Sequence, residues 1–286
     1  MKHFYIVTNR PKDPDLAVTR EITDYLRAHG GICRVRPEPS DPAQDYRYTD
    51  PTDIPPETEC IIVLGGDGTL MLAAGDVADL HIPLLGVNLG NLGYLAELDR
   101  SSMLPALDCL LRDEYQIENR MMLEGTVYCG EEEMRRDIAM NDVVIGRQDG
   151  MHIITLDVLV NGAFLNTYRA DGMIVATPTG STGYSLSAGG PIIAPEANLF
   201  MLTPVAPHTL NTRAIILPPE SRITVQIGPG RDNRVQEAMA YFDGDEMLPL
   251  RTGDRVEICR ARTDARILKI HHDSFLDTLR RKLTAL

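Results

Sequence analysis

The chain has 286 residues, of which 43% are apolar, and this is enough for one large domain or for two medium-sized domains with separate cores. Its formal net charge is -13 and its sequence pI is about 5.0. A field of this sign repels nucleic acids and anionic membranes, so we expect neither as a partner.

The first third alternates short apolar runs with one helical pattern. Residues 4–8 predict a first strand, and Asp15 is expected to cap a helix that ends at Gly30-Gly31. Residues 32–35, 60–64 and 83–87 predict further strands, the last two as continuous apolar runs typical of buried parallel strands. The proline-rich loop 36–58 is interpreted as mobile or as a cover over a site. We therefore predict an α/β N-terminal domain, residues 1–115, with an open, mostly parallel sheet.

The pattern changes near residue 116. Short strand-like runs separated by Gly, Asn and Asp follow at residues 142–145, 153–160, 173–176, 223–227 and 255–259. They predict a β-rich C-terminal domain over residues 116–270. The tail, residues 271–286, contains an amphipathic pattern at 274–283, and we expect this helix to pack back on the first domain.

The cysteines and the N-terminal residues indicate the cellular compartment of the protein. The five cysteines are odd in number and lack metal-ligand spacing, and Cys33, Cys60 and Cys259 lie in or beside apolar runs, which predicts buried free thiols. No apolar run approaches transmembrane length, and the short stretch after Met1 is typical of a strand rather than of a signal peptide. We therefore expect a cytoplasmic protein.

A glycine-rich loop follows the buried strand 60–64. Its residues 65–69 read Gly-Gly-Asp-Gly-Thr and precede a helix expected over 70–78. Glycines let the backbone approach a bulky anion, and N–H groups at a helix start can hold it. The carboxylate of Asp67 repels phosphate, so its place in this loop is not explained by phosphate binding. It suits a base that takes a proton from an attacking hydroxyl, or a group that acts through a metal. A tight turn with Asp67 as helix N-cap is the structural alternative, and both interpretations stay open.

Two other clusters suggest ligand binding. Residues 171–191 run from an apolar strand into a loop dense in hydroxyls and glycines, where Tyr184 can offer its ring face to a base. Asn141-Asp142 precedes the strand 143–145 and can hold the hydroxyls or the base of a nucleoside, although a turn is the commoner reason for such a pair. His208 is interpreted as structural.

Together these segments resemble the NAD kinase family. The resemblance rests on the loop 65–69, on Asn141-Asp142, and on residues 171–182, which read Asp-Gly-Met-Ile-Val-Ala-Thr-Pro-Thr-Gly-Ser-Thr. Residues 86–94 and 207–210 also look like family segments, and the order holds over most of the chain. The glycine loop alone also occurs in phosphofructokinases and diacylglycerol-type lipid kinases, so the combination with the Thr/Ser/Gly loop carries the specificity.

The resemblance implies phosphoryl transfer from ATP, with Mg²⁺, to the 2′-hydroxyl of the adenosine ribose of NAD, and a homodimer or homotetramer. Asp67 would be the catalytic base, and no metal ligands are assigned. Asn141 and Asp142 would hold the ribose hydroxyls, and the loop 182–187 would contact the adenine. All positions that would bind NAD are Asp67, Gly68, Tyr94, Asn141, Asp142, His152, Arg169, Asp171, Thr182, Gly183, Tyr184, Ser185, Leu186, Ser187, Ala206 and Asp245.

The chain departs from the family pattern at four positions. Asp142 replaces a Glu, Gly183 a common Ala, Leu89 a small polar residue, and Asp245 a Gln. These departures bear on the affinity for NAD and on the preference between NAD and NADH, and ATP and polyphosphate are both candidate donors. The alternative functions are a related lipid or sugar kinase, and a non-catalytic dinucleotide sensor, against which the retained Asp67 argues.

Overall fold

The computed structural model describes residues 1–37, 49–90, 93–96, 98–148, 152–209, 212–270 and 274–284. The chain divides into two compact units. The first consists of Met1–Arg120 and Asp264–Leu286, and the second of Met121–Thr263.

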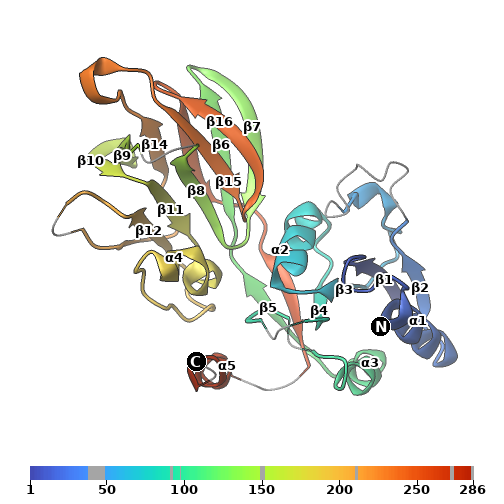
Figure 1. Cartoon of the computed structure of the whole chain (residues 1–286). Helices are drawn as coiled ribbons and strands as arrows, with labels where there is room; N and C mark the ends of the chain where they lie inside the picture. The colour runs from blue at the N-terminus through green and yellow to red at the C-terminus, as the bar shows by residue number, and fades with distance from the viewer. Residues whose placement is uncertain are drawn as a thin grey trace. The chain divides into compact units, whose positions relative to one another are not determined.

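The first unit is built on a mixed, mostly parallel sheet (Figure 1). Its strand order is β2-β1-β3-β4-β18-β5, and all neighbouring pairs are parallel except β18 with β5. The strands are β1 (His3–Thr8), β2 (Ile32–Val35), β3 (Cys60–Gly65), β4 (Leu84–Asn88), β5 (Gln116–Arg120) and β18 (Ala265–Lys269). Every residue of β3 and β4 is buried, as the continuous apolar runs predict for strands covered on both faces.

Helices cover both faces of this sheet. The apolar sides of α1 (Ala17–Ala28) and α3 (Met103–Leu111) form one core with Leu85 and Val87 of β4. Gly86, between these two residues, belongs to the opposite face of the sheet, because successive residues of a strand alternate between the two faces. There, a Cβ on Gly86 would stand 2.9 Å from a methyl carbon of Leu70 in α2 (Asp67–Asp76). The predicted α/β architecture is confirmed.

The start of α1 differs from the prediction. The capping carboxylate belongs to Asp13 and not to Asp15: it accepts the N–H groups of Val18 at 3.2 Å and Thr19 at 2.9 Å. Leu16 precedes the helix with a left-handed φ of 52°, which turns the chain so that the earlier carboxylate reaches the first turn. Asp13 is buried, whereas Asp15 is exposed. The helix predicted over 70–78 begins earlier, at Asp67.

The unit boundaries also differ from the predicted 115 and 270. β5 and β18 fall inside the predicted second domain, yet they complete the sheet of the first unit. The two strands pair antiparallel with each other, and β18 joins β4 through Ile267 and Leu84. The chain thus crosses into the second unit and returns, which a reading of local patterns along the sequence does not reveal. The loop 36–58 lies partly outside the described residues.

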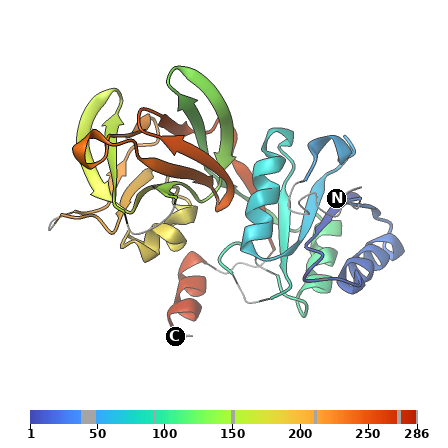
Figure 2. The ribbon, with the colours of Figure 1, turned by 45° about the horizontal axis from the view of Figure 1, so that its top comes forward.

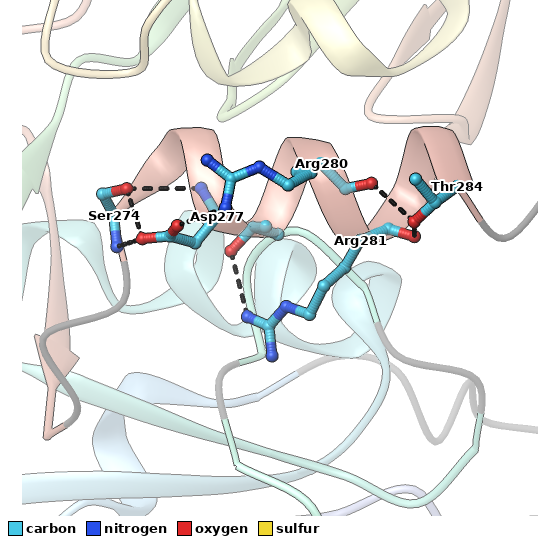
Figure 3. Close-up of polar contacts among 6 residues, drawn as sticks. Ser274, Asp277, Arg280, Arg281 and Thr284 are labelled. Carbon is cyan, nitrogen blue, oxygen red and sulfur yellow. Dashed lines mark hydrogen bonds and ion pairs between the residues drawn. The ribbon is translucent and has the colours of Figure 1, made fainter.

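The C-terminal helix α5 (Phe275–Thr284) begins with a reciprocal cap (Figure 3). Ser274 Oγ accepts the N–H of Asp277 at 3.2 Å, and Asp277 Oδ2 accepts the N–H of Ser274 at 3.1 Å. Further along, the Lys282 ammonium lies 5.3 Å from the centroid of the Tyr94 ring. Residues of the helix are grouped with the first unit. Packing of the whole helix on the first domain stays a prediction.

The second unit is a sandwich of two antiparallel sheets (Figure 2). One sheet has the order β10 (Ala163–Ala170), β9 (Ile154–Val160), β14 (Ile223–Ile227), β17 (Arg255–Arg260), β6 (Leu123–Cys129), β7 (Glu132–Ala139). The other has the order β13 (Ile215–Leu217), β12 (Phe200–Val205), β11 (Gly172–Ala176), β8 (Asp142–Arg147), β15 (Glu237–Phe242), β16 (Asp245–Arg251). Side chains of both sheets share one core, for example Ile145 and Val175 with Leu156 and Val225. The β-rich C-terminal domain is confirmed.

The hydroxyl-rich loop covers the outer face of the second sheet. Val144, Ile174 and Met201 point to this face, and Ala188 and Ile193 pack against them. This cover includes a 3₁₀ turn at Thr179–Thr182 and the short helix α4 (Tyr184–Ser187). The loop predicted to bind ligand is therefore held against a sheet instead of projecting freely.

The described residues also bear on the remaining predictions. All five cysteines are free thiols; Cys60 is buried, whereas Cys33 and Cys259 are only partly buried and Cys129 is exposed. Within the described part of the chain, no helix combines the length and the apolar character needed to cross a membrane.

Candidate functional site

In the first unit, the glycine loop forms the junction between β3 and α2. Gly65 ends the strand, Gly66 is the N-cap residue with extended backbone, and Asp67 is the first helical residue. A Cβ at Gly65 would stand 2.4 Å from Thr69 Oγ1, so only glycine lets the turn close this tightly. Gly68 has no neighbouring atom within 4 Å of where its Cβ would stand. The loop therefore leaves open space at the start of α2.

The Asp67 carboxylate is held by backbone N–H groups from another segment. Oδ2 accepts the N–H of Tyr94 at 2.6 Å, and Oδ1 accepts those of Leu95 at 3.2 Å and Ala96 at 3.0 Å. The interpretation of Asp67 as the N-cap is thus wrong, because Gly66 occupies that position and the carboxylate bonds away from its own helix. A carboxylate has about four acceptor sites, so these bonds leave one on Oδ2.

Gly93 makes the room for that carboxylate. A Cβ built on Gly93 would stand 1.9 Å from Oδ1, 2.1 Å from Cγ and 2.2 Å from Oδ2 of Asp67. No side chain fits there without displacing the carboxylate. Sequence reasoning grouped Gly93 with the segment 86–94 without giving it a role.

A cation also lies beside the glycine loop. Lys12 follows β1, and its Nζ stands 2.9 Å from where a Cβ of Gly66 would be. The same loop reaches α2 through Asn9, whose Nδ2 donates to Thr69 Oγ1 at 2.9 Å. Asn9 Oδ1 is buried and has no hydrogen-bond partner among the described residues. The sequence shows no Lys or Arg next to the glycine loop, and the parallel pairing of β1 with β3 is what brings Lys12 there.

The second unit contains a cavity of about 620 Å³ that brings together several predicted residues. Asn141, Asp142, Asp171 and Tyr184 line it. The Tyr184 side chain is exposed, so its ring face is available to a ligand. Asn141 Oδ1 is buried and lacks a hydrogen-bond partner among the described residues. An unpaired buried oxygen is costly, which suits a position that receives a hydroxyl from a ligand.

The carboxylate of Asp142 lies at the wall of this cavity and is only 5% exposed. Burial, together with the nearby charge of Asp243, raises its pKa to about 7. Burial likewise raises the pKa of Asp243 to about 6, against the opposing effect of backbone N–H groups. The pKa values of both carboxyls are therefore raised above the ordinary range of an aspartate.

The hydroxyl-rich loop is fastened to the segment that carries Asn141. Thr177 donates its backbone N–H to Asn141 O at 2.9 Å and its hydroxyl to Met140 O at 2.6 Å. A Cβ on Gly180 would stand 2.2 Å from Asn141 O, so glycine is required for this contact. The structure thus gives Thr177 and Gly180 of this loop a packing role.

Other predicted residues lie outside the lining of this cavity. The hydroxyl of Ser185 is buried and bonds to Thr203 Oγ1 at 3.1 Å, and that of Thr182 donates to Thr179 O at 3.3 Å. His152 and Arg169 line a second hollow of about 940 Å³, which shares Arg147 with the cavity of Asn141 and Asp142. The remaining residues outside the lining are Gly183, Leu186, Ser187, Ala206 and Asp245 in the second unit and Gly68 and Tyr94 in the first. Their roles toward NAD stay predictions.

Two family models match the chain. The ATP-NAD kinase N-terminal domain matches residues 15–115, and the ATP-NAD kinase C-terminal domain matches residues 140–270. The "NAD kinase" of Lachnospira eligens is 46% identical over 297 residues, with 99% of this chain and 100% of the relative covered. The "NAD kinase" of Agathobacter rectalis is 45% identical over 283 residues, with 99% of each covered.

Solved structures agree in fold. The yeast NADH kinase complexed with NADH superposes with a TM-score of 0.85 at 24% identity, covering 99% of this chain and 88% of that one. An NAD kinase from Archaeoglobus fulgidus in complex with ATP gives a TM-score of 0.74 at 20% identity, with 99% of both chains covered. With the family models matching both halves and relatives matching the full length, the chain belongs to the NAD kinase family and is a phosphotransferase.

Proposed function

We propose that the chain transfers the terminal phosphoryl group of ATP to the 2′-hydroxyl of the adenosine ribose of NAD, with Asp67 as the catalytic base. This role is supported by the hydrogen bonds of the Asp67 carboxylate. Three backbone N–H groups hold the carboxylate in place, and one acceptor site is left on Oδ2. A ribose hydroxyl is a weak nucleophile at neutral pH, and a fixed carboxylate can take its proton as the phosphoryl group arrives.

Asn141 and Asp142 are proposed to hold the adenosine ribose. The unpaired Asn141 Oδ1 and the Asp142 carboxylate both accept hydrogen bonds, as two neighbouring sugar hydroxyls require. Tyr184 offers its exposed ring to the adenine from the same cavity. Asp171 lines the cavity as well, in an ion pair of 3.4 Å with Arg147.

The donor phosphates are proposed to bind at the start of α2. Gly66 leaves the backbone accessible there, the helix N-terminus favours negative charge, and the Lys12 ammonium lies beside it. Together these groups supply local positive potential in a chain whose net charge is -13.

A Mg²⁺ ion carried by ATP fits the same place. Among the described residues, no cluster of three or more His, Cys, Asp or Glu side chains could form a metal site. Mg²⁺ in phosphoryl-transfer sites is held mostly by phosphates and water with one or two protein oxygens. The unpaired Asn9 Oδ1 is a protein oxygen of this kind beside the loop. The ion would neutralise phosphate charge.

The decisive experiment is Asp67→Asn, which keeps the shape of the side chain and removes its basic charge. We expect the turnover number to fall at least about a hundredfold, the usual lower range for a lost general base. NAD titration and thermal melting should change little. Relief by high Mg²⁺ concentration would assign Asp67 to the metal instead, and near-normal turnover would remove it from the mechanism.

A coupled dehydrogenase assay for NADP, with NAD, ATP and Mg²⁺, separates this function from its rivals. A lipid or sugar kinase and a non-catalytic sensor would both give no NADP. Replacing ATP with polyphosphate, and NAD with NADH, in the same assay measures donor and acceptor preference.

The cellular setting is proposed to be the cytoplasm, in line with five free thiols, and the assembly to be a homodimer or homotetramer, in line with the family. Light scattering at assay concentration should give a mass of at least twice 31.7 kDa. A monomer at that concentration would contradict the proposed assembly.

A further inference from the structure

The turn between β15 and β16 holds the segment that carries Asn141 and Asp142. The Asp243 carboxylate accepts three backbone N–H groups: Oδ2 that of Met140 at 2.7 Å, and Oδ1 those of Asn141 at 2.7 Å and Asp142 at 3.0 Å. In return, the N–H of Asp243 donates to Asp142 O at 3.1 Å. The turn and the segment are therefore joined in both directions.

The same segment is held from its carbonyl side by Thr177, which donates to Met140 O and Asn141 O. Its N–H groups are held by Asp243, so the backbone is fixed on both sides. The Asn141 Oδ1 itself has no partner among the described residues. The backbone therefore sets the position from which this oxygen is presented.

The backbone of the turn is shaped for this contact. Asp243 has a left-handed φ of 49° and Gly244 a φ of 75°. Aspartate and asparagine tolerate this region better than most residues, whereas other side chains are strained there. A conformation of this kind persists where surrounding contacts compensate it, as the three N–H groups do here.

We propose that Asp243 is a positioning residue for the acceptor substrate, which aligns Asn141 and Asp142 with the ribose of NAD and acts through this pair. The proposal rests on the proposed function of the pair. Charged hydrogen bonds are roughly twice as strong as neutral ones, so a carboxylate fixes three amides more firmly than a neutral side chain would.

Asp243 also acts on Asp142 through its charge. Among the described residues, other charged or titratable groups near these carboxylates are Asp137 of β7, whose charge raises the pKa of Asp243, and the cavity residues Tyr184, Arg147, Asp171 and Tyr241. The Asp243 charge contributes to the raised pKa of Asp142, after burial itself. Removing that charge should move the ionisation of Asp142, and with it the pH dependence of NAD binding, to lower pH.

Asp243→Asn is the cleanest test. Asn tolerates the left-handed backbone, and its oxygen can still serve two of the amides, while its NH₂ group faces the third. We expect the KM for NAD to rise about tenfold, as for one lost charged hydrogen bond. The KM for ATP should change less than about threefold. Asp243→Gly removes the carboxylate without straining the backbone and should raise the KM for NAD further.

A matched control is Asp254→Asn. Asp254 also accepts a backbone N–H in the second unit, that of Arg251 at 2.8 Å, but lies outside the lining of the cavity. The Asp254→Asn variant should leave the KM for NAD unchanged. Thermal melting of all variants identifies general loss of fold.

Three outcomes decide the proposal. If Asp243 acts through the pair, the triple variant Asn141→Ala/Asp142→Ala/Asp243→Asn should bind NAD no more weakly than Asn141→Ala/Asp142→Ala, and the pH profile of Asp243→Asn should shift to lower pH. An effect of Asp142→Ala with none of Asp243→Asn overturns the positioning role only. No effect of Asp142→Ala on NAD binding overturns both the positioning role and the proposed function of the pair.

Discussion

Replacing Gly93 by alanine tests whether catalysis depends on where the Asp67 carboxylate is held. The added Cβ would stand 1.9–2.2 Å from three atoms of that carboxylate. Non-bonded contacts need about 3.5 Å, so the carboxylate must retreat by more than about 1 Å. The retreat would also break the hydrogen bond of 2.6 Å from Tyr94. A misplacement of about 1 Å can cost about a hundredfold in rate, so we expect that loss in the turnover number.

The assay is the coupled measurement of NADP formation, with thermal melting and NAD titration on the same preparations. Gly90→Ala is the matched control from the same segment, because its Cβ would meet nothing closer than 3.5 Å. It should keep the turnover number within a few-fold. Combining Gly93→Ala with Asp67→Asn should add little to the defect of Asp67→Asn alone. Near-normal turnover of a folded Gly93→Ala variant would show that catalysis does not depend on where the Asp67 carboxylate is held.

Three further predictions concern other parts of the chain. Lys12→Met keeps the length of the side chain and removes its charge, so the KM for ATP should rise about tenfold in initial-rate measurements while the KM for NAD stays constant. NAD affinity should increase as pH rises through about 7, because the raised pKa leaves Asp142 protonated below that value, and a neutral carboxyl accepts a hydrogen bond from the ribose more weakly than a carboxylate does; a pH-independent titration would contradict this. Asp13→Ala should lower the free energy of unfolding in urea by about 1–2 kcal/mol through loss of the α1 cap, while Asp15→Ala should leave it unchanged; equal effects of the two variants would contradict the assignment of the cap.

The residues that sequence reasoning missed share one property. Each of them contacts residues far from it in the chain. The pairing of β1 with β3 brings Lys12 to the glycine loop, and the contact of Asp67 with residues 94–96 brings the Asp67 carboxylate to Gly93. The turn between β15 and β16 brings Asp243 to residues 140–142. Their neighbours in sequence give no sign of these contacts. Gly93 did have a signal, its place in a family-like segment, but the reason for glycine there is steric and appears only in three dimensions.

The sequence by itself determined the fold class and the family, because both depend on local patterns: continuous apolar strands, short strands between turn residues, and the loop 65–69 with the loop 171–182. It also placed Asn141, Asp142, Asp171 and Tyr184 among the binding residues, and the structure brings these four to one cavity. Tertiary structure alone decided that β18 returns to the first sheet, that Asp13 caps α1, and that Asp67 bonds to another segment. Each of these depends on which distant backbone groups meet, and only the packed chain determines that.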